Sequence, residues 1–214
     1  MRLLLARHGA TPNNAEQRYT GQSDVPLSSL GERQAEALAR RLATERPDCI
    51  VTSDLSRARA TAEAIARFHR VPVHLDADLR EISMGAWEGS TYAEILDREP
   101  EAMRIWQADP TSYAPPGGET VAQVRDRLVV ALERWQQAYP KGTVVWVTHG
   151  GVIGILLCQL LGMDLNRRWQ FRRDNAALTE LDLGDDYAIL MSLNDLSHLR
   201  ELMGEGTAEE RQVL

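Results

Sequence analysis

Two short and mostly apolar segments, residues 2–7 (RLLLAR) and 143–148 (TVVWVT), each run directly into a histidine followed by a glycine. A continuous apolar run of this length is typical of a strand that is buried on both faces. Such strands belong to sheets that carry helices on both sides, as in α/β proteins. These two segments therefore constrain the fold more than any other feature of the chain.

Other strands and helices are predicted to alternate along the chain. Further strands are expected at residues 49–52 and 71–75, and a closing hairpin is expected at 177–183 and 187–193. Apolar residues recur at helical spacing over residues 35–42, 55–66 and 121–135, and Ser53 is the expected N-cap of the second helix. We predict an α/β fold, a three-layer α/β/α sandwich with a largely parallel central sheet.

One domain is expected to cover residues 1–203, because a chain of 214 residues has the size of one large domain. Residues 91–116 look helical and then proline-rich, and we expect them to form a small helical and loop insertion over the site, at one end of the sheet. Residues 204–214 are expected to form a mobile C-terminal tail.

Composition excludes several classes of protein. The net charge is −7, from 31 acidic and 24 basic side chains, which argues against nucleic acid as a partner. The apolar runs at residues 1–6 and 152–161 are too short for a signal peptide and a membrane span, so no membrane partner is expected. Cys49 and Cys158 lie far apart, without disulfide or metal-ligand spacing, and this favours a cytoplasmic location.

Ligands of open α/β sheets gather beyond the carboxyl ends of the strands, and His8 and His149 both lie at such ends. Arg7 stands beside His8 at the end of a predicted buried strand. A guanidinium group is costly to bury without an anionic partner. If the ligand is anionic, the site must therefore be a local basic pocket in an acidic protein.

Ten short blocks make the chain resemble the histidine phosphatase superfamily, which includes the cofactor-dependent phosphoglycerate mutases. They follow the family's order and cover nearly all of residues 2–199. In chain order they are RHGATPNN (7–14), RYTG (18–21), LSSLGERQA (27–35), SDLSRARATA (53–62), LREI (79–82), GAWEG (85–89), GGET (117–120), VTHGG (147–151), DNA (174–176) and LND (193–195).

The resemblance implies a role for each residue of the chemical set. His8 would be the nucleophile that forms a phosphohistidine, and a neutral imidazole is available for this near neutral pH. Arg7 and Arg57 would grip the phosphoryl oxygens, to which a guanidinium offers matching fork geometry. His149 would be a second donor to the phosphoryl group. Glu81 would be the general acid and later the base for the hydrolytic water.

The resemblance also implies four substrate-binding residues in the phosphate-binding loops, whose residue types are less specific for phosphate: Asn14, Thr20, Gly21 and Gly150. Arg59 lies on another side of its helix from Arg57 and is expected to be a surface charge. Trp87 is expected to pack in the core. The other histidines lack a glycine at a strand end and are expected to be structural, namely His69, His74 and His198.

Three functions remain open: a phosphatase, a phosphoglycerate mutase, and an inactive phosphate-binding or scaffold protein. The complete chemical set argues against the third. Mutases of the family resemble Glu-Arg-His-Tyr-Gly after the acid, whereas this chain reads Glu81-Ile82-Ser83-Met84-Gly85, which favours a phosphatase. We expect a small phosphate monoester as substrate, inorganic phosphate as product, and neither cofactor nor metal. A homodimer stays open.

The substrate also stays open between phosphoserine, α-ribazole phosphate, a sugar phosphate, phosphoglycerate and a broad range. Residues 193–199 resemble the ending of the phosphoserine type. Met84, however, stands where that type carries a histidine, and Ala10 replaces the usual acidic or amide residue.

Overall fold

The computed structural model describes residues 1–205 of the chain, with side chains up to residue 202. Residues 206–214 of the predicted tail lie outside the described residues, whereas residues 204 and 205 end the last helix, α8 (Arg200–Glu205).

A six-stranded sheet forms the centre of the molecule, in the order β3-β2-β4-β1-β5-β6. The first four of these strands are mutually parallel, and β5 and β6 form an antiparallel hairpin beside β1. The largely parallel sheet and the closing hairpin are therefore both confirmed. The strands are β1 (Arg2–Arg7), β2 (Cys49–Thr52), β3 (Val73–Leu75), β4 (Thr143–Thr148), β5 (Leu178–Leu183) and β6 (Ala188–Asp195).

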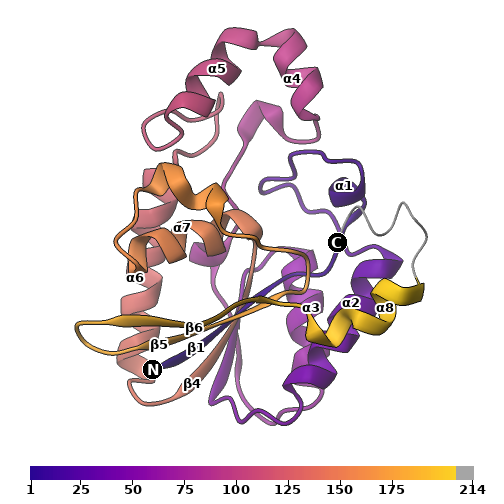
Figure 1. Ribbon diagram of the computed structural model, residues 1–214, viewed down its shortest axis with the longest axis vertical. Coiled ribbons are helices and arrows are strands. Elements are labelled where there is room, and N and C mark those ends of the chain that lie inside the picture. The colour runs from indigo at the N-terminus through magenta and orange to yellow at the C-terminus, as the bar shows by residue number, and fades with distance from the viewer. Residues whose placement is uncertain (206–214) are drawn as a thin grey trace.

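Helices cover both faces of this sheet (Figure 1). α2 (Ser29–Leu42) and α3 (Ser56–Ala66) pack on one face, where they meet Leu4 and Ala6 of β1. α6 (Val121–Ala138) and α7 (Gly150–Leu160) pack on the other face, against Leu3 and Leu5. Successive side chains of a strand point to opposite faces, so the unbroken apolar run of β1 supplies two cores at once.

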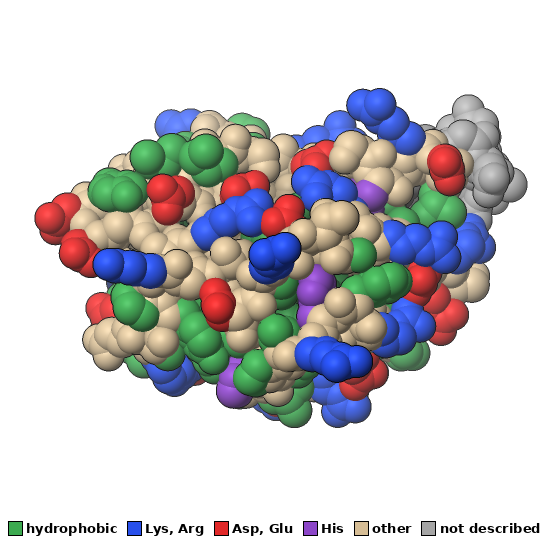
Figure 2. Space-filling view, turned by 90° about the horizontal axis from the view of Figure 1, so that it is seen from below, with side chains coloured by type: hydrophobic (Ala, Val, Ile, Leu, Met, Phe, Trp, Pro, Cys, Tyr) green, Lys and Arg blue, Asp and Glu red, His purple; other side chains and the backbone are tan. Residues whose placement is uncertain are grey.

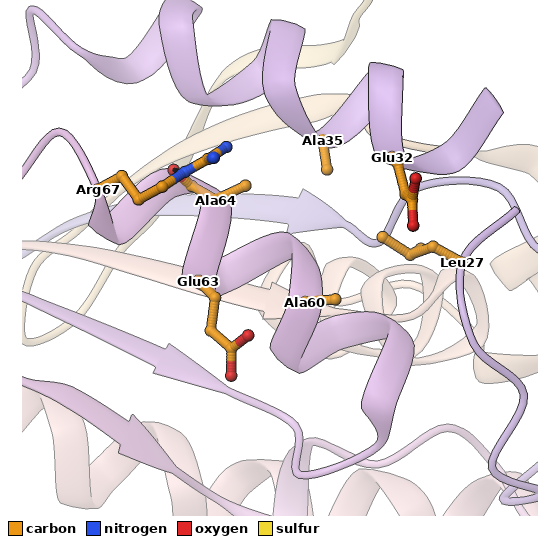
Figure 3. A pocket seen from close by; sticks show the side chains of 7 residues that line it. All are labelled: Leu27, Glu32, Ala35, Ala60, Glu63, Ala64 and Arg67. Atoms are coloured by element: carbon orange, nitrogen blue, oxygen red, sulfur yellow. Dashed lines mark hydrogen bonds between the residues drawn. The ribbon is translucent and has the colours of Figure 1, made fainter. Parts of the chain in front are cut away.

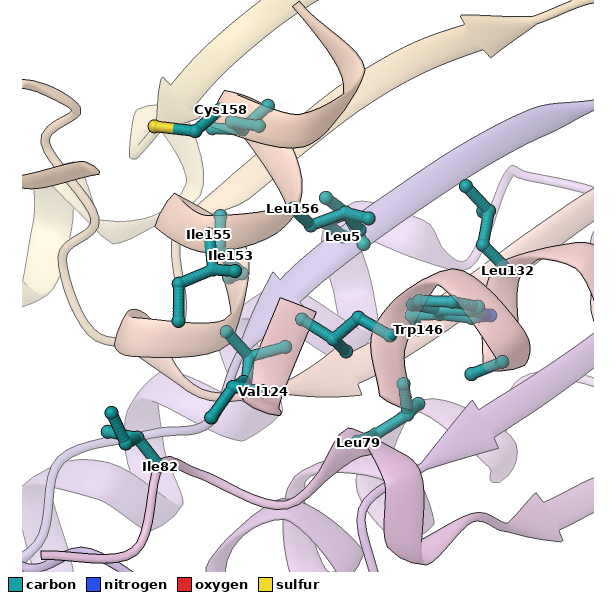
Figure 4. Close-up of a cluster of buried hydrophobic side chains, with 14 of the residues drawn as sticks. Leu5, Leu79, Ile82, Val124, Leu132, Trp146, Ile153, Ile155, Leu156 and Cys158 are labelled. Carbon is teal, nitrogen blue, oxygen red and sulfur yellow. The ribbon is translucent and has the colours of Figure 1, made fainter. Parts of the chain in front are cut away.

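The core on the side of α6 and α7 is the larger of the two (Figure 4). α7 is buried almost all round, which explains the uninterrupted apolar sequence from Val152 to Leu157. Trp146 of β4 is fully buried in the same cluster. Each fully buried large apolar side chain contributes about 1.5–3 kcal/mol to folding, and this packing holds the ends of β1 and β4 in place.

The segment predicted as an insertion forms two short helices, α4 (Tyr92–Arg98) and α5 (Pro100–Ala108). They stand beyond the sheet, at the top of Figure 1. Trp106 of α5 makes edge-to-face contacts with Tyr19 and Trp87, with ring centroids 6.1 and 5.6 Å apart. Trp87 is fully buried, as predicted. The aromatic contacts anchor the insertion to the loop that follows α1 (Pro12–Ala15).

Short 3₁₀ helices complete the chain: η1 (Ala77–Leu79), η2 (Gly85–Trp87), η3 (Leu165–Gln170) and η4 (Ser197–Leu199). Among the described residues, no helix has the length and apolar character that a membrane crossing requires. Figure 2 views the molecule from below Figure 1, and there basic and acidic side chains are interspersed rather than gathered by sign.

The structure corrects the predicted start of α3. Leu55, not Ser53, is the N-cap residue, and its side chain makes no capping hydrogen bond. The backbone N–H of Ser56 instead donates to Oδ1 of Asp24 at 2.7 Å. A carboxylate from a distant loop thus supplies the cap, a long-range contact that local spacing does not reveal. The Ser53 hydroxyl instead lies 2.9 Å from Nε2 of His149.

Candidate active site

The two histidines meet at the ends of neighbouring strands. β1 pairs in parallel with β4, with Arg7 opposite Thr148, and the N–H of His8 donates to the Thr148 carbonyl at 3.0 Å. The ring centroids of His8 and His149 are 5.0 Å apart. The prediction that both histidines lie at the carboxyl ends of strands is therefore confirmed.

The ring of His8 has one nitrogen held and one left for chemistry. Its Nδ1 lies 2.7 Å from the carbonyl oxygen of Gly9, and a carbonyl only accepts, so Nδ1 carries the proton. In the neutral ring Nε2 then bears the lone pair. Burial lowers the pKa of His8 well below its usual value, and the charges of Arg7 and Arg57 lower it further. His8 is thus neutral near pH 7.

Arg7 and Arg57 are oriented by main-chain carbonyls. Nη1 of Arg7 donates to the carbonyl of Arg173 at 2.5 Å. Arg57 donates from Nη1 to Ser23 at 2.9 Å and from Nη2 to Gly21 at 2.8 Å. The Nε atoms of Arg7 and Arg57 are both buried and have no hydrogen-bond partner within the part of the chain that the structure describes.

Burial lowers the pKa of both guanidinium groups, to about 10 for Arg7. The groups stay charged at neutral pH. Arg57 lies in the first turn of α3, as predicted, and the N-terminal end of a helix favours an anion there.

His149 is fully buried at the N-cap of α7. Its Nε2 lies 2.9 Å from the Ser53 hydroxyl, which also accepts from the N–H of Leu55 at 3.3 Å. A hydroxyl that accepts from Leu55 can donate its proton to Nε2, which leaves Nδ1 of His149 as the donor. That Nδ1 is buried and has no hydrogen-bond partner among the residues that the structure describes. Burial, together with the neighbouring charges, holds the pKa of His149 well below its usual value.

The carboxylate of Glu81, which lies in the loop before η2, contacts the first turn of α7. Its Oε2 accepts from the N–H of Gly151 at 3.1 Å, and its Oε1 accepts from its neighbour Ile82 at 3.0 Å. A Cβ atom on Gly151 would lie 2.4 Å from Oε1 of Glu81, so a glycine is needed for the carboxylate to approach. Sequence reasoning missed this role of Gly151, for which the doubled glycine was the only signal.

Gly21 and Gly150, two of the less specific candidates, contact the arginines of the site. The carbonyl of Gly21 holds Arg57, and its φ of +53° suits a glycine. Gly150 packs against Arg7, whose Nε would lie 3.2 Å from a Cβ placed there. These contacts position the guanidinium groups. Direct contact of Gly21 or Gly150 with a phosphate stays a prediction.

The other two weaker candidates lie in loops near His8. Asn14 forms a capping box with Thr11, and its Oδ1 accepts from Asn175 Nδ2 at 3.2 Å. Asn175 also donates to the His8 carbonyl at 3.1 Å. Thr20 accepts through its carbonyl from Ser23 in the turn that also carries Gly21. The structure thus links Asn14 to His8, and a phosphate contact of Asn14 or Thr20 stays a prediction.

Arg168 and Arg173 are half-buried beside the predicted set, and sequence reasoning missed both. The charge of Glu81 acts on both of them, as it does on Arg7 and Arg57. The sequence signal was faint: Arg173 directly precedes the Asp-Asn-Ala block of residues 174–176, in a segment without periodicity.

The residues predicted to be structural lie outside this cluster. Arg59 is half-exposed and pairs with Glu63 on the surface of α3. Nε2 of His198 lies 3.0 Å from the Ala176 carbonyl, and the tilted rings of His74 and Trp135 have their centroids 5.0 Å apart. Across residues 1–205, no group of three or more His, Cys, Asp or Glu side chains is arranged to hold a metal ion.

A surface groove of about 390 Å³ lies elsewhere, between α2 and α3 (Figure 3). Its walls are short alanine side chains with charged residues at the rim, and none of the predicted site residues lines it. A groove without a buried polar group offers no chemistry, so we place the site at the strand ends. The groove is lined by Leu27, Glu32, Ala35, Ala60, Glu63, Ala64 and Arg67.

Comparison with protein families gives one match over nearly the whole chain. The model of the histidine phosphatase superfamily (branch 1) matches residues 3–196. This range contains all the predicted catalytic and phosphate-binding residues.

Known relatives and structures agree with that match. Phosphoserine phosphatase 1 of Hydrogenobacter thermophilus is 34% identical over 205 residues, which cover 96% of this chain and 97% of the relative. Glucosyl-3-phosphoglycerate phosphatase of Mycolicibacterium vanbaalenii is 41% identical over 172 residues, or 77% of this chain and 76% of the relative. The structure of the alpha-ribazole phosphatase from Shigella flexneri has a TM-score of 0.85 at 30% identity and covers 91% of this chain and 96% of its own.

Proposed function

The chain belongs to the histidine phosphatase superfamily, and on that premise we propose that it is a phosphatase that hydrolyses small phosphate monoesters through a phosphohistidine on His8, without a metal ion. One observation carries the proposal. Nε of Arg7, Nε of Arg57 and Nδ1 of His149 are buried nitrogens without a hydrogen-bond partner among the described residues. The charges of both arginines act on His8, whose ring centroid lies 5.0 Å from that of His149. An unpaired buried donor costs about 1–3 kcal/mol, and a phosphoryl group would satisfy all three.

The first step is attack of the Nε2 lone pair of His8 on phosphorus. The bond from phosphorus to the ester oxygen breaks, and the protonated carboxyl of Glu81 donates its proton to the leaving alkoxide. Arg7, Arg57 and His149 stabilise the charge on the equatorial phosphoryl oxygens.

The second step returns the enzyme to its starting state. Glu81, now a carboxylate, takes a proton from a water molecule that attacks the phosphohistidine. The phosphorus–nitrogen bond breaks, inorganic phosphate is released, and the lone pair returns to Nε2 of His8. The cationic side chains supply the positive charge that Mg²⁺ supplies in other phosphoryl-transfer enzymes.

A hydrolase is favoured over a mutase by the segment that follows Glu81. Ile82 and Met84 are buried apolar residues, and they stand where mutases of the family resemble Arg and Tyr. The similar proteins named above are phosphoserine, glucosyl-3-phosphoglycerate and alpha-ribazole phosphatases. Their names support hydrolysis of a phosphate monoester.

The experiment measures phosphate release from para-nitrophenyl phosphate and from a panel of phosphorylated metabolites after prolonged dialysis against a chelator. We expect the wild-type rate to survive dialysis and His8→Ala to lose at least about a thousandfold, because attack requires this one imidazole. His69→Ala, a histidine outside the site, is the matched control. A loss of phosphate release on dialysis that added Mg²⁺ restores would contradict the metal-free mechanism. A His8→Ala protein with substantial activity would exclude His8 as the nucleophile.

A further inference from the structure

Two arginines beside the phosphoryl site, Arg168 and Arg173, take no part in the steps described above. Arg168 belongs to η3, and Arg173 follows in the loop that leads to β5. Within the described part of the chain, neither guanidinium forms an ion pair with a carboxylate. Burial lowers the pKa of both groups, which means that their charges are poorly solvated.

Arg173 lies along the first turns of α7. Its Nη1 donates to the carbonyl of Gly150 at 3.0 Å, and its own carbonyl accepts from Arg7 at 2.5 Å. A Cβ atom on Gly154 would come within 2.2 Å of the same Nη1. Gly154 therefore makes room for the guanidinium group, which is held next to the phosphoryl site.

Arg168 is held between α7 and the insertion. Its guanidinium carbon lies 5.9 Å from the centre of the Trp106 ring in α5. Its carbonyl oxygen would lie 3.0 Å from the same Cβ position on Gly154 that Arg173 approaches. The two arginines are thus neighbours, and the charge of Arg173 further lowers the pKa of Arg168.

The charges around the site do not balance once a phosphoryl group is bound. A phosphate dianion is matched by Arg7 and Arg57. Glu81 attracts Arg168 and Arg173 while it is ionised, but it is neutral when it serves as the acid. Two adjacent cations then have no counter-charge, and poorly solvated like charges are unfavourable without a ligand between them.

We propose that Arg168 and Arg173 bind a second anionic group on the alcohol half of the substrate, so that the preferred substrate is a phosphate monoester that also carries a carboxylate. This inference rests on the proposed function, because it assigns the other half of the same substrate. A guanidinium group offers paired N–H donors that match a carboxylate. The stretch after Glu81 has no guanidinium group, whereas η3 and the loop between η3 and β5 supply two, those of Arg168 and Arg173.

The test compares two compounds that differ mainly in the carboxylate, 3-phosphoglycerate and glycerol 3-phosphate. Each competes with para-nitrophenyl phosphate, so that its inhibition constant reports binding whether or not it is itself hydrolysed. We expect the wild-type protein to bind 3-phosphoglycerate roughly ten- to a hundredfold more tightly, the effect of a charge-assisted contact.

Arg168→Gln and Arg173→Gln are each expected to reduce that preference to within about threefold, with little change in binding of glycerol 3-phosphate. Arg173→Lys keeps the charge without the fork and is expected to restore part of the preference. Arg167→Gln is the matched control, since it removes an exposed charge from the same 3₁₀ helix and is expected to keep the full preference.

Equal inhibition constants for the two compounds in the wild-type protein would overturn the inference. An equal weakening of the binding of both compounds in the Gln variants would also overturn the inference, because Arg173 would then serve only to support Arg7. If para-nitrophenyl phosphate is not hydrolysed at all, the proposed function fails instead. Titration calorimetry with the same two compounds then still tests the carboxylate preference, so the two failures are distinguishable.

Discussion

A contact between the His8 ring and a main-chain carbonyl determines how the ring is used. Because Nδ1 donates to the Gly9 carbonyl, the lone pair of the neutral ring stays on Nε2. The charges of Arg7 and Arg57 disfavour a positive charge on this ring, and we propose that they also attract the phosphoryl oxygens. In the proposed mechanism, the same two cations therefore favour both the neutral form of His8 and the binding of the phosphoryl group.

The lowered pKa of His8 predicts how stability depends on pH. Near pH 6.5 the unfolded chain protonates this ring whereas the native protein does not, so the free energy of unfolding falls as the pH decreases. His8→Gln removes this contribution and is expected to weaken the decline between about pH 7.5 and pH 5.5 by up to about 1.4 kcal/mol. Urea unfolding of both proteins measures it, and other titrating groups cancel in the comparison. Identical declines would contradict a depressed pKa.

Glu81→Gln tests the acid role through the leaving group. General-acid help is worth about 10²–10⁴-fold, and a phenolate needs less of it than an alkoxide. We expect the phosphorylation burst to slow strongly with an alkyl phosphate and weakly with para-nitrophenyl phosphate. The burst is measured by rapid quench, because the proposed mechanism also uses Glu81 in the later attack of water. Equal slowing with both substrates would remove Glu81 from the acid role.

At the scale of elements, the first turn of α7 assembles the site. Gly150 lets Arg7 approach, Gly151 lets Glu81 approach, and His149 occupies the N-cap. The apolar run of α7 and its helical form could be predicted, because they follow from local pattern. The glycine contacts could not, since they depend on residues from β1 and from the loop after η1.

Gly151→Ala tests this use of α7. The added Cβ would lie 2.4 Å from Oε1 of Glu81 and must displace the carboxylate. Alanine also favours the helix over glycine by up to about 1 kcal/mol. We therefore expect alkyl phosphate turnover to fall sharply while the melting temperature holds or rises. Steady-state rates and thermal unfolding measure the two effects, and unchanged turnover would show that Gly151 does not position the acid.

At the scale of the whole molecule, the sheet brings together residues that are far apart in sequence. The order of layers and the meeting of His8 with His149 could be predicted, because buried strands and strand ends follow from hydrophobic pattern. Arg168 and Arg173 could not, because they lie in a 3₁₀ helix and a loop that have no periodicity. The predicted N-cap role of Ser53 is wrong because the capping hydrogen bond of α3 comes from the distant Asp24.

The fate of the phosphoryl group distinguishes a phosphatase from a mutase. With 3-phosphoglycerate we expect the protein to release inorganic phosphate or to leave the compound unchanged, and to form little 2-phosphoglycerate, because a mutase must keep its intermediate away from water. A phosphorus NMR time course with and without catalytic 2,3-bisphosphoglycerate measures both products. Rapid interconversion of the two monophosphates that depends on the primer and outruns phosphate release would place the chain among the isomerases.

The most direct test of the central claim is to trap the phosphorylated enzyme. The protein is mixed with a ³²P-labelled monoester and quenched in denaturant at alkaline pH within milliseconds, and the labelled peptide is then sequenced by mass spectrometry. We predict one phosphate per chain on His8, stable in base and lost in acid, forming at least as fast as turnover. A label on another residue, or turnover with no labelled protein on that timescale, would contradict the phosphohistidine mechanism.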